Sequence, residues 1–426
     1  MRHSQSRPVA LCVLLLGGLL ATAVPARADD FVYPGAQPKL GAGAGQTLSR
    51  GSSAIFYNPA NLIYSKFIQP DLDVSFAKVT YTYQQVDTDK YDPVVVNVTA
   101  PPVTAGLSFR PVPSFSVGIS FLPTGTGNDQ EVPNVPLELT SGAYQVMDVS
   151  TKQTGYKIAA GAAFRFAFPF TAGVGIIHAS EKTQTIITES GKTDPFIDAL
   201  YAANSNRFVL GMRSELFDRA FVAALTYKTA VTKNYQGDIL INLDPATSDY
   251  QVFTGVGYEP AVIGLGLEAR FGVTGVYFDM VHKSWSGGRS VVKQGFGIDP
   301  LEVDLVDTNS FVVGGKVWIA GKHMLTGAFG LVPSNIGTGT EEAAGTASGL
   351  DDGTSQAIGG VTFGNFDAIP RQIFSGGYRY KLTGNGSLEL GGSYQSGTRV
   401  VPDGYNQAGT YTLSVIMLTA GLAYGF

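Results

Sequence analysis

The sequence predicts an all-β fold, a transmembrane antiparallel β-barrel of about 14 strands with an N-terminal plug in its lumen. Three observations indicate this fold. The chain begins with an export signal, its later segments alternate apolar with small or polar residues, and it ends on an amphipathic strand that closes with Phe426. The predicted organisation is a signal peptide at 1–28, a plug (here called the hatch) at 29–70 and the barrel at 71–426.

The export signal has three parts in the expected order. Arginines precede a short apolar run at 9–20, and an Ala-Arg-Ala triplet at 26–28 fits a cleavage site. The run is too short to span a bilayer as a helix. Cys12, the only cysteine, lies in this segment, so the mature chain has no disulfide and no thiolate metal site. Loss of the three basic residues of the signal takes the net charge from −5 to −8, which argues against a nucleic-acid partner.

The alternation of side chains predicts the barrel strands. In 103–110 and 114–123, apolar residues occupy every second position, and the link between the two segments is short enough only for a hairpin. Short links alternate with long ones along the chain, as in barrels with tight periplasmic turns and long outer loops. The predicted strands are 72–86, 102–110, 114–123, 143–165, 169–185, 206–216, 220–235, 258–271, 273–285, 308–320, 323–333, 371–382, 386–398 and 410–426.

The last strand is the most specific sign of an outer-membrane barrel. Its alternation places five residues on one face: Leu418, Ala420, Leu422, Tyr424 and Phe426. The pattern resembles the signature by which the outer-membrane insertion machinery selects its clients. That machinery is therefore an expected partner through Phe426, and outer-membrane lipid is another.

Residues 29–70 do not alternate and are predicted to fold inside the barrel. Their most specific stretch is SSAIFYNPANL at 52–62, where an apolar run meets Asn58-Pro59. Pro59 fixes its own φ and lacks an N–H, and it biases Asn58 towards an extended conformation. The Asn58 side chain can bond backbone groups inside the lumen. The alternative is an ordinary turn that leads into the first strand.

Several stretches resemble the long-chain fatty acid transporter (FadL) family. They are the run at 41–62 with its Asn-Pro-Ala, the hairpin LSFRPVPSFSVGISFLPTGTG, the segment YFDMVHKSWS, and IPRQIFSGGYRYKL followed by SLELGGSYQSG. The resemblance covers nearly the whole mature chain. It implies a fourteen-stranded barrel closed by the hatch, with hydrophobic molecules as cargo. The hatch and ligand residues that it implies are Phe31, Ile55, Phe56, Tyr57, Asn58, Pro59 and Ala60.

The resemblance also implies a docking groove and a side exit. The segment DPFIDALYAAN predicts a short helix that begins after Asp194, with Phe196, Leu200 and Tyr201 near one face. In the family, outer loops of this kind form an apolar docking groove. An inward kink in an early strand lets ligand leave sideways, and here Gly118 and Pro123 are the residues expected to bend that strand.

The strongest signal for a different chemistry is His282-Lys283-Ser284. On a strand, His282 and Ser284 share a face, and their apolar neighbours make that face the lipid side. Outer-membrane phospholipase resembles this arrangement but adds an Asn that orients the His, and the sequence assigns no Asn to the neighbouring strand at matching height. We therefore predict that the protein is not an enzyme. His178 and His323 are expected in the lumen or in a turn.

The predicted function is passive uptake of hydrophobic small molecules, long-chain fatty acids or hydrocarbons, across the outer membrane of a Gram-negative bacterium. The protein is expected to act as a monomer without cofactor or metal. Three alternatives stay open: a general diffusion porin, an outer-membrane lipase and an adhesin. The acidic loop 299–307 has oxygen ligands that suit Ca²⁺, although a solvated loop is the simpler interpretation.

Overall fold

The structure, a computed structural model, describes residues 34–85, 94–100, 103–124, 130–140, 143–167, 169–189, 191–244, 247–286, 291–292, 301–302, 306–335, 369–382, 385–401 and 409–426. The predicted signal peptide and Phe31 lie outside these residues, as does most of the acidic loop. None of the helices within them is long and apolar enough to cross a membrane.

Within the described residues, four short helices precede the strands: α3 (Ala36–Leu40), η1 (Gly51–Ser53), α4 (Ala54–Tyr57) and η2 (Pro59–Tyr64). The strands are β1 (Ile68–Gln85), β2 (Val94–Ala100), β3 (Val103–Val112), β4 (Phe115–Thr124), β5 (Gln130–Thr140), β6 (Ala143–Ala167), β7 (Phe170–Glu189), β8 (Pro195–Leu216), β9 (Phe221–Lys228), β10 (Val231–Asp244), β11 (Thr247–Glu259), β12 (Ala261–Phe271), β13 (Thr274–Ser284), β14 (Val291–Val292), β15 (Leu301–Glu302), β16 (Thr308–Ile319), β17 (His323–Val332), β18 (Arg371–Lys381), β19 (Gly386–Val401) and β20 (Gly409–Tyr424).

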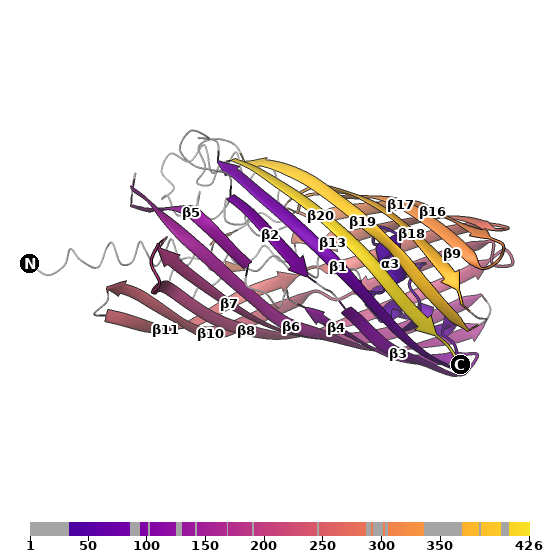
Figure 1. Ribbon diagram of the computed structural model, residues 1–426. Coiled ribbons are helices and arrows are strands. Elements are labelled where there is room, and N and C mark those ends of the chain that lie inside the picture. Colours follow the sequence, from indigo (N-terminus) through magenta and orange to yellow (C-terminus); the bar gives the residue numbers. More distant parts are fainter. Residues whose placement is uncertain are drawn as a thin grey trace, which may run out of the picture.

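The strands other than the small β14–β15 pair form one closed antiparallel barrel (Figure 1). Neighbours in the chain pair with each other, and β1 closes the barrel against β20 over its whole length. Four passes are each broken into two strands, namely β2/β3, β4/β5, β9/β10 and β11/β12. The described strands therefore make fourteen passes, which confirms the predicted fold class.

The alternation of side chains separates a lipid face from a lumen face. On β20, Ile416, Leu418 and Leu422 point outwards and are 47–60% exposed, whereas Leu413 and Val415, at alternate positions, are fully buried. The predicted outward face of the last strand is confirmed. Because the outside of the barrel is apolar and the inside carries most of the charged side chains, the fold suits a bilayer rather than water.

The two ends of the barrel differ in the length of their links. At one end the turns are short, and Gly272 and Gly321 take the positive φ of 59° and 68° that these tight turns require. The chain also begins and ends its barrel there, since the N–H of Phe426 donates to the carbonyl of Ile68 at 2.9 Å. Short turns mark the periplasmic end of such barrels, so the opposite end is the outer one.

The barrel extends further outwards than the sequence predicted. β2, β5, most of β10 and most of β11 fall in segments that were expected to be loops. The helix predicted after Asp194 is also wrong, because β8 begins at Pro195 and runs unbroken to Leu216. These extensions are supported by ladders to neighbouring strands, such as the pairing of β10 with both β8 and β11. Local side-chain patterns contain little of that information.

Candidate functional site

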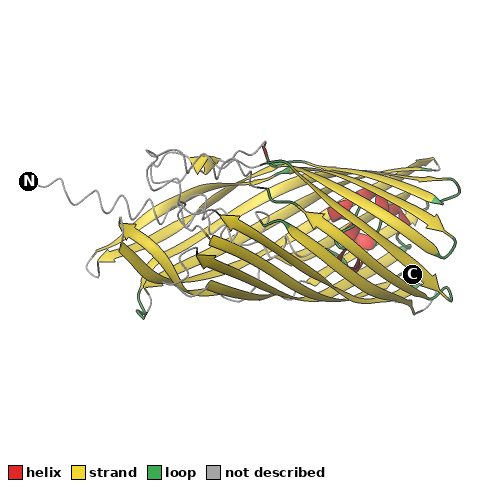
Figure 2. Ribbon diagram, turned by 90° about the horizontal axis from the view of Figure 1, so that it is seen from above, coloured by secondary structure: helices red, strands yellow, loops and turns green. Residues whose placement is uncertain are grey.

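The hatch lies inside the periplasmic half of the barrel (Figure 2). α3 contacts β17 to β20, η1 contacts β1, β3 and β4, and α4 and η2 contact β6 to β8. These contacts place the segment from residue 34 to the start of β1 inside the lumen, against β1, β3, β4, β6 to β8 and β17 to β20. The predicted hatch at 29–70 includes the first residues of β1, which begins at Ile68.

The apolar segment 55–57 packs against the wall and does not face open space. Ile55, Phe56 and Tyr57 are 0%, 5% and 7% exposed, and they form one cluster with barrel residues such as Val209 and Ile177. A cargo surface presented into the lumen, which the sequence suggested, is therefore not what this segment provides. The segment holds the hatch in place.

The Asn-Pro-Ala turn adopts the geometry expected from its sequence. Asn58 is extended, with φ −143° and ψ 100°, and its Oδ1 accepts from the N–H of Ala60 at 3.0 Å. Its Nδ2 donates to the carbonyl of Met212 in β8 at 2.9 Å. The Asn58 side chain is fully buried, so both bonds form away from water. The turn is thus tied to the barrel wall as well as to itself.

Glycines in the wall make room for this turn. A Cβ on Gly173 would lie 2.4 Å from the backbone nitrogen of Ala60, and one on Gly211 would lie 2.1 Å from Oδ1 of Asn58. Real Cβ atoms do not approach other atoms so closely, so β7 and β8 must carry glycine here for the hatch to fit. The sequence shows many glycines but not which of them face the hatch.

Polar ties fix the rest of the hatch. Lys39, 1% exposed, forms an ion pair with Asp73 of β1 and donates to Ser75 Oγ at 2.7 Å. Burial lowers the pKa of the Lys39 amine, and the charge of Asp73 opposes that shift. On the other side, Arg213 of β8 donates to the carbonyl of Thr47 at 3.0 Å. The sequence did not predict these strand residues as contacts of the hatch. For Asp73 and Arg213, the only available signal is a charged residue within an alternating strand.

Two of the predicted docking residues, Leu200 and Tyr201, lie on opposite faces of a strand. Phe196, Leu200 and Tyr201 all belong to β8. Leu200 points outwards and is 37% exposed, whereas Tyr201 is 5% exposed in the lumen, with its ring 5.7 Å from that of Tyr235. Because successive strand residues alternate, these side chains cannot form one helical groove surface.

The outer half of the lumen has an aromatic and apolar lining. Tyr81, Tyr83 and Tyr411 gather where β1 meets β20, with the rings of Tyr83 and Tyr411 stacked at 4.7 Å. Each of the three is at most 5% exposed, and the fully buried Leu413 and Val415 continue the surface on β20. These tyrosines were not among the predicted site residues, although the two on β1 alternate with polar residues in the sequence.

The wall has an unpaired edge in its outer half. β2 pairs with β1 and β5 pairs with β6, but among the described strands no ladder joins β2 to β5, although the two lie in contact. The regular pairing of β3 with β4 reaches outwards as far as Ala105 and Phe121. Pro123 follows just beyond, paired with Tyr156 of β6 and with no residue of β3, and it has no N–H to offer.

Gly118 does not lie beside this edge, contrary to the prediction. It pairs with Ser108 on one side and Gly161 on the other. A Cβ on Gly118 would lie 2.8 Å from a methyl of Leu62, so the residue makes room for the hatch. The sequence suggested that this glycine bends the strand. In the structure, its lack of a side chain leaves room for Leu62 of the hatch.

No family model matches the sequence, and no well-characterised protein matches it at the level of sequence. Solved structures do match. A FadL homologue of Pseudomonas aeruginosa aligns over 92% of this chain and 98% of its own, with a TM-score of 0.64 and 13% identity. The toluene transporter TodX of Pseudomonas putida aligns over the same shares with a TM-score of 0.62 and 13% identity.

A third similar structure is the toluene transporter TbuX of Ralstonia pickettii, with a TM-score of 0.59, 12% identity and coverage of 92% of this chain and 98% of its own. These alignments include nearly all of each barrel and do not stop at a shared hairpin. The expected resemblance is confirmed in the arrangement of the strands, and the chain has the fold of the FadL-type outer-membrane channels.

Proposed function

We propose that the protein carries hydrophobic small molecules, such as fatty acids or hydrocarbons, passively across the outer membrane of a Gram-negative bacterium. The observation that carries this proposal is the packing of the hatch inside the lumen. The hatch contacts β1, β3, β4, β6 to β8 and β17 to β20 in the periplasmic half and is tied to the wall by buried bonds, as at Asn58 and Lys39. A barrel closed in this way is poorly suited to free diffusion of water and ions.

The lining of the outer half supports an apolar cargo. The tyrosines where β1 meets β20, together with Leu413 and Val415, lie on the lumen side of the wall and are packed against other residues, each at most 5% exposed. A hydrophobic molecule that moves between them keeps its apolar area away from water. The similar structures are described as toluene transporters and as a FadL homologue, which supports the same class of cargo here.

We place the exit of the cargo at the inner end of the unpaired edge, where the pairing of β3 with β4 stops after Ala105 and Phe121. Backbone groups at membrane depth that lack a ladder partner are tolerated where they line a cavity or a passage. Pro123 lies at this edge and cannot restore a ladder bond through its nitrogen. In this proposal ligand passes sideways into the bilayer, so the hatch need not leave the barrel.

Conductance and uptake test the proposal together. In planar bilayers the protein should show no large, stable, ohmic channel, whereas a general diffusion porin would. Vesicles that contain the protein should take up a fluorescent long-chain fatty acid faster than empty vesicles. A large steady conductance without faster uptake would overturn the proposal in favour of a porin.

A reversible cross-link tests the exit. Cys12 is the only cysteine of the chain, so one cysteine placed in β2 (Val94–Ala100) and one in β5 (Gln130–Thr140) would be the only thiols once the predicted signal is removed. Pairs of positions are scanned with a reducible bifunctional reagent; a pair that is bridged should slow uptake, and reduction should restore it. A control bridge between Ile416 of β20 and Lys78 of β1, which are already paired and face outwards, should change nothing. Equal uptake with both bridges would exclude this exit.

Two further expectations belong to the same proposal. Phe426 is 67% exposed on the outer face, where the insertion machinery can reach it, and the protein is expected to work as a monomer. Phe31 keeps its predicted role in contact with ligand, and a Phe31→Ala variant with weaker binding of the fluorescent fatty acid would support that role.

A further inference from the structure

The outer rim of the barrel holds a serine, a histidine and an asparagine in a continuous hydrogen-bonded row. Ser284 Oγ lies 3.3 Å from His282 Nε2, and His282 Nδ1 lies 3.0 Å from Asn309 Oδ1. Asn309 stands on β16 directly opposite His282 of β13. The sequence assigned no asparagine to the neighbouring strand at this height, and Asn309 corrects that point.

The donors and acceptors in this row follow the order that an activated nucleophile needs. Asn309 Oδ1 can only accept, so the proton of a neutral imidazole is placed on Nδ1 and Nε2 is left as an acceptor. Ser284 then donates its hydroxyl proton to Nε2. A serine bonded to a base that a third group orients is the general arrangement for nucleophilic catalysis, and the distances suit an unliganded site.

A second His–Asn pair on the same barrel shows that the serine bond is not automatic. His178 of β7 faces outwards, contrary to the expectation of a lumen or turn position, and its Nδ1 lies 3.0 Å from Asn206 Oδ1 on β8. Ser180 follows two residues later, as Ser284 follows His282. Among the described hydrogen bonds, however, none joins Ser180 to His178. The first pair alone is a complete row.

The position of His282 and Ser284 on the barrel indicates which substrates can reach them. His282 and Ser284 point outwards, because the alternate residues Tyr277 and Asp279 are buried in the lumen. Just below them the outer surface is apolar, with Phe311 40% exposed and paired with Met280. The boundary between the apolar belt and the polar rim is where the ester groups of lipids lie, so an ester carbonyl reaches Ser284 while its chain stays in hydrocarbon.

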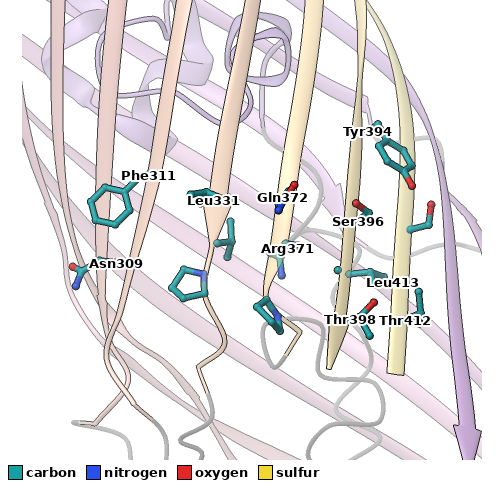
Figure 3. A pocket seen from close by; sticks show the side chains of 15 residues that line it. Asn309, Phe311, Leu331, Arg371, Gln372, Tyr394, Ser396, Thr398, Thr412 and Leu413 are labelled. Atoms are coloured by element: carbon teal, nitrogen blue, oxygen red, sulfur yellow. The ribbon is translucent and has the colours of Figure 1, made fainter. Parts of the chain in front are cut away.

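A hollow beside the row offers a place for that chain. It has a volume of about 720 Å³ and extends from Asn309 across β17 and β18 to β20 (Figure 3). Phe311, Leu331 and Tyr394 supply its apolar lining, and each is at least 40% exposed on the outer face. An acyl chain bound there would continue from an ester placed at the row.

A backbone amide next to the row is occupied by a carboxylate. β13 ends at Ser284, and the N–H of Ser286 leaves the ladder and donates to Asp307 Oδ1 at 2.8 Å. The other oxygen of that carboxylate lies 4.0 Å from His282 Nε2. An oxyanion could use the Ser286 N–H during acyl transfer only after the exposed Asp307 side chain turns away from it.

We propose that Ser284, His282 and Asn309 form a hydrolytic site for carboxylic esters that carry an apolar acyl chain. Ser284 Oγ bonds to the ester carbonyl carbon while its proton passes to His282 Nε2. The bond from that carbon to the alcohol oxygen then breaks, and the alcohol leaves with the proton. Water attacks the acyl-serine, gives a proton to Nε2 and releases the carboxylic acid as Ser284 regains its proton. Asn309 positions the imidazole throughout.

The test combines hydrolysis with covalent labelling of the folded barrel in detergent. The substrates are p-nitrophenyl esters of acetic, octanoic and palmitic acid, and the label is an alkyl fluorophosphonate located by mass spectrometry. Wild-type protein should hydrolyse the longer esters and carry the label on Ser284. Ser284→Ala should lose label and at least about 10³-fold of the hydrolysis. Ser180→Ala, the matched control, should lose neither.

Asn309 needs a separate readout because its substitution changes orientation and not the reacting groups. Asn309→Asp retains an acceptor for Nδ1–H and should keep kcat within about tenfold, whereas Asn309→Leu should lower kcat by about 10²–10⁴-fold with KM unchanged. Absence of label on wild-type Ser284, or equal hydrolysis by wild type and Ser284→Ala, would overturn the proposal. Uptake of fatty acid by Ser284→Ala is expected to be normal. The hydrolase proposal can therefore fail without any effect on the proposed transport function.

Discussion

The hatch meets the barrel in different ways on its two sides. At β7 and β8 the wall touches the backbone of the hatch, as where Gly173 faces the Pro59–Ala60 bond. At β1 and β18 the contacts are made by side chains, namely the ion pair of Lys39 with Asp73 and the Leu40 methyl groups against Gly377. Backbone contacts allow no adjustment, whereas a side chain can rotate. The first side therefore sets the position of the hatch, and the second sets how strongly it is held.

The largest effect is expected from Lys39→Met. The substitution leaves the Asp73 carboxylate buried without its cation, which lowers the free energy of unfolding by about 3–5 kcal/mol. Urea unfolding of the barrel in lipid vesicles would measure the loss. The double variant Lys39→Met/Asp73→Leu should recover most of it, because no buried charge then remains. If single and double variants were equally stable, the ion pair would not be the tie that we describe.

Gly173→Ala should displace the hatch on the backbone side. The added Cβ would lie 2.4 Å from the Ala60 nitrogen, and neither chain can turn away, so overpacking costs about 1–3 kcal/mol or more. We expect a lower temperature for loss of the fast-migrating folded band on gels, together with flickering conductance in planar bilayers. A variant with wild-type stability and no conductance would show that the hatch is less fixed at β7 than the contacts indicate.

Asn58→Leu tests the same side through hydrogen bonds. The change removes the acceptor for the Ala60 N–H and the donor to the Met212 carbonyl, and both groups stay buried. Unsatisfied buried groups of this kind cost about 1–3 kcal/mol. The same gel assay should show an intermediate loss, smaller than that of Lys39→Met. A loss below about 0.5 kcal/mol would mean that water reaches these groups.

Gly377→Ala should have the smallest effect and serves as the matched partner of Gly173→Ala. Its added Cβ would lie 2.6 Å from Leu40 Cδ1, the end of a side chain that can change rotamer. We expect a loss of less than about 1 kcal/mol, relieved further by Leu40→Ala in the same chain. An effect as large as that of Gly173→Ala would remove the difference between the two sides.

The predicted helix after Asp194 shows where reading the sequence failed. Its apolar residues have helical spacing and it starts with an N-cap and a proline, yet it forms the outer end of β8. β7 and β10 offer ladder partners on both sides of this segment, and a strand fits between them where a helix would leave their edges unpaired. Outward extensions such as β10 were missed for a related reason: above the bilayer, neither face of a strand needs to be apolar.

The class of the fold, its closing strand and the geometry of the Asn58-Pro59 turn could be predicted from the sequence. These features depend on local physics, since alternation places every second side chain in lipid and proline restricts the residue before it. The approach of Gly173 to the Pro59–Ala60 bond, the ion pair of Lys39 with Asp73 and the place of Asn309 opposite His282 could not be predicted in this way. These relations depend on strand register and on the path of the hatch through the lumen, which are fixed by closing the whole barrel.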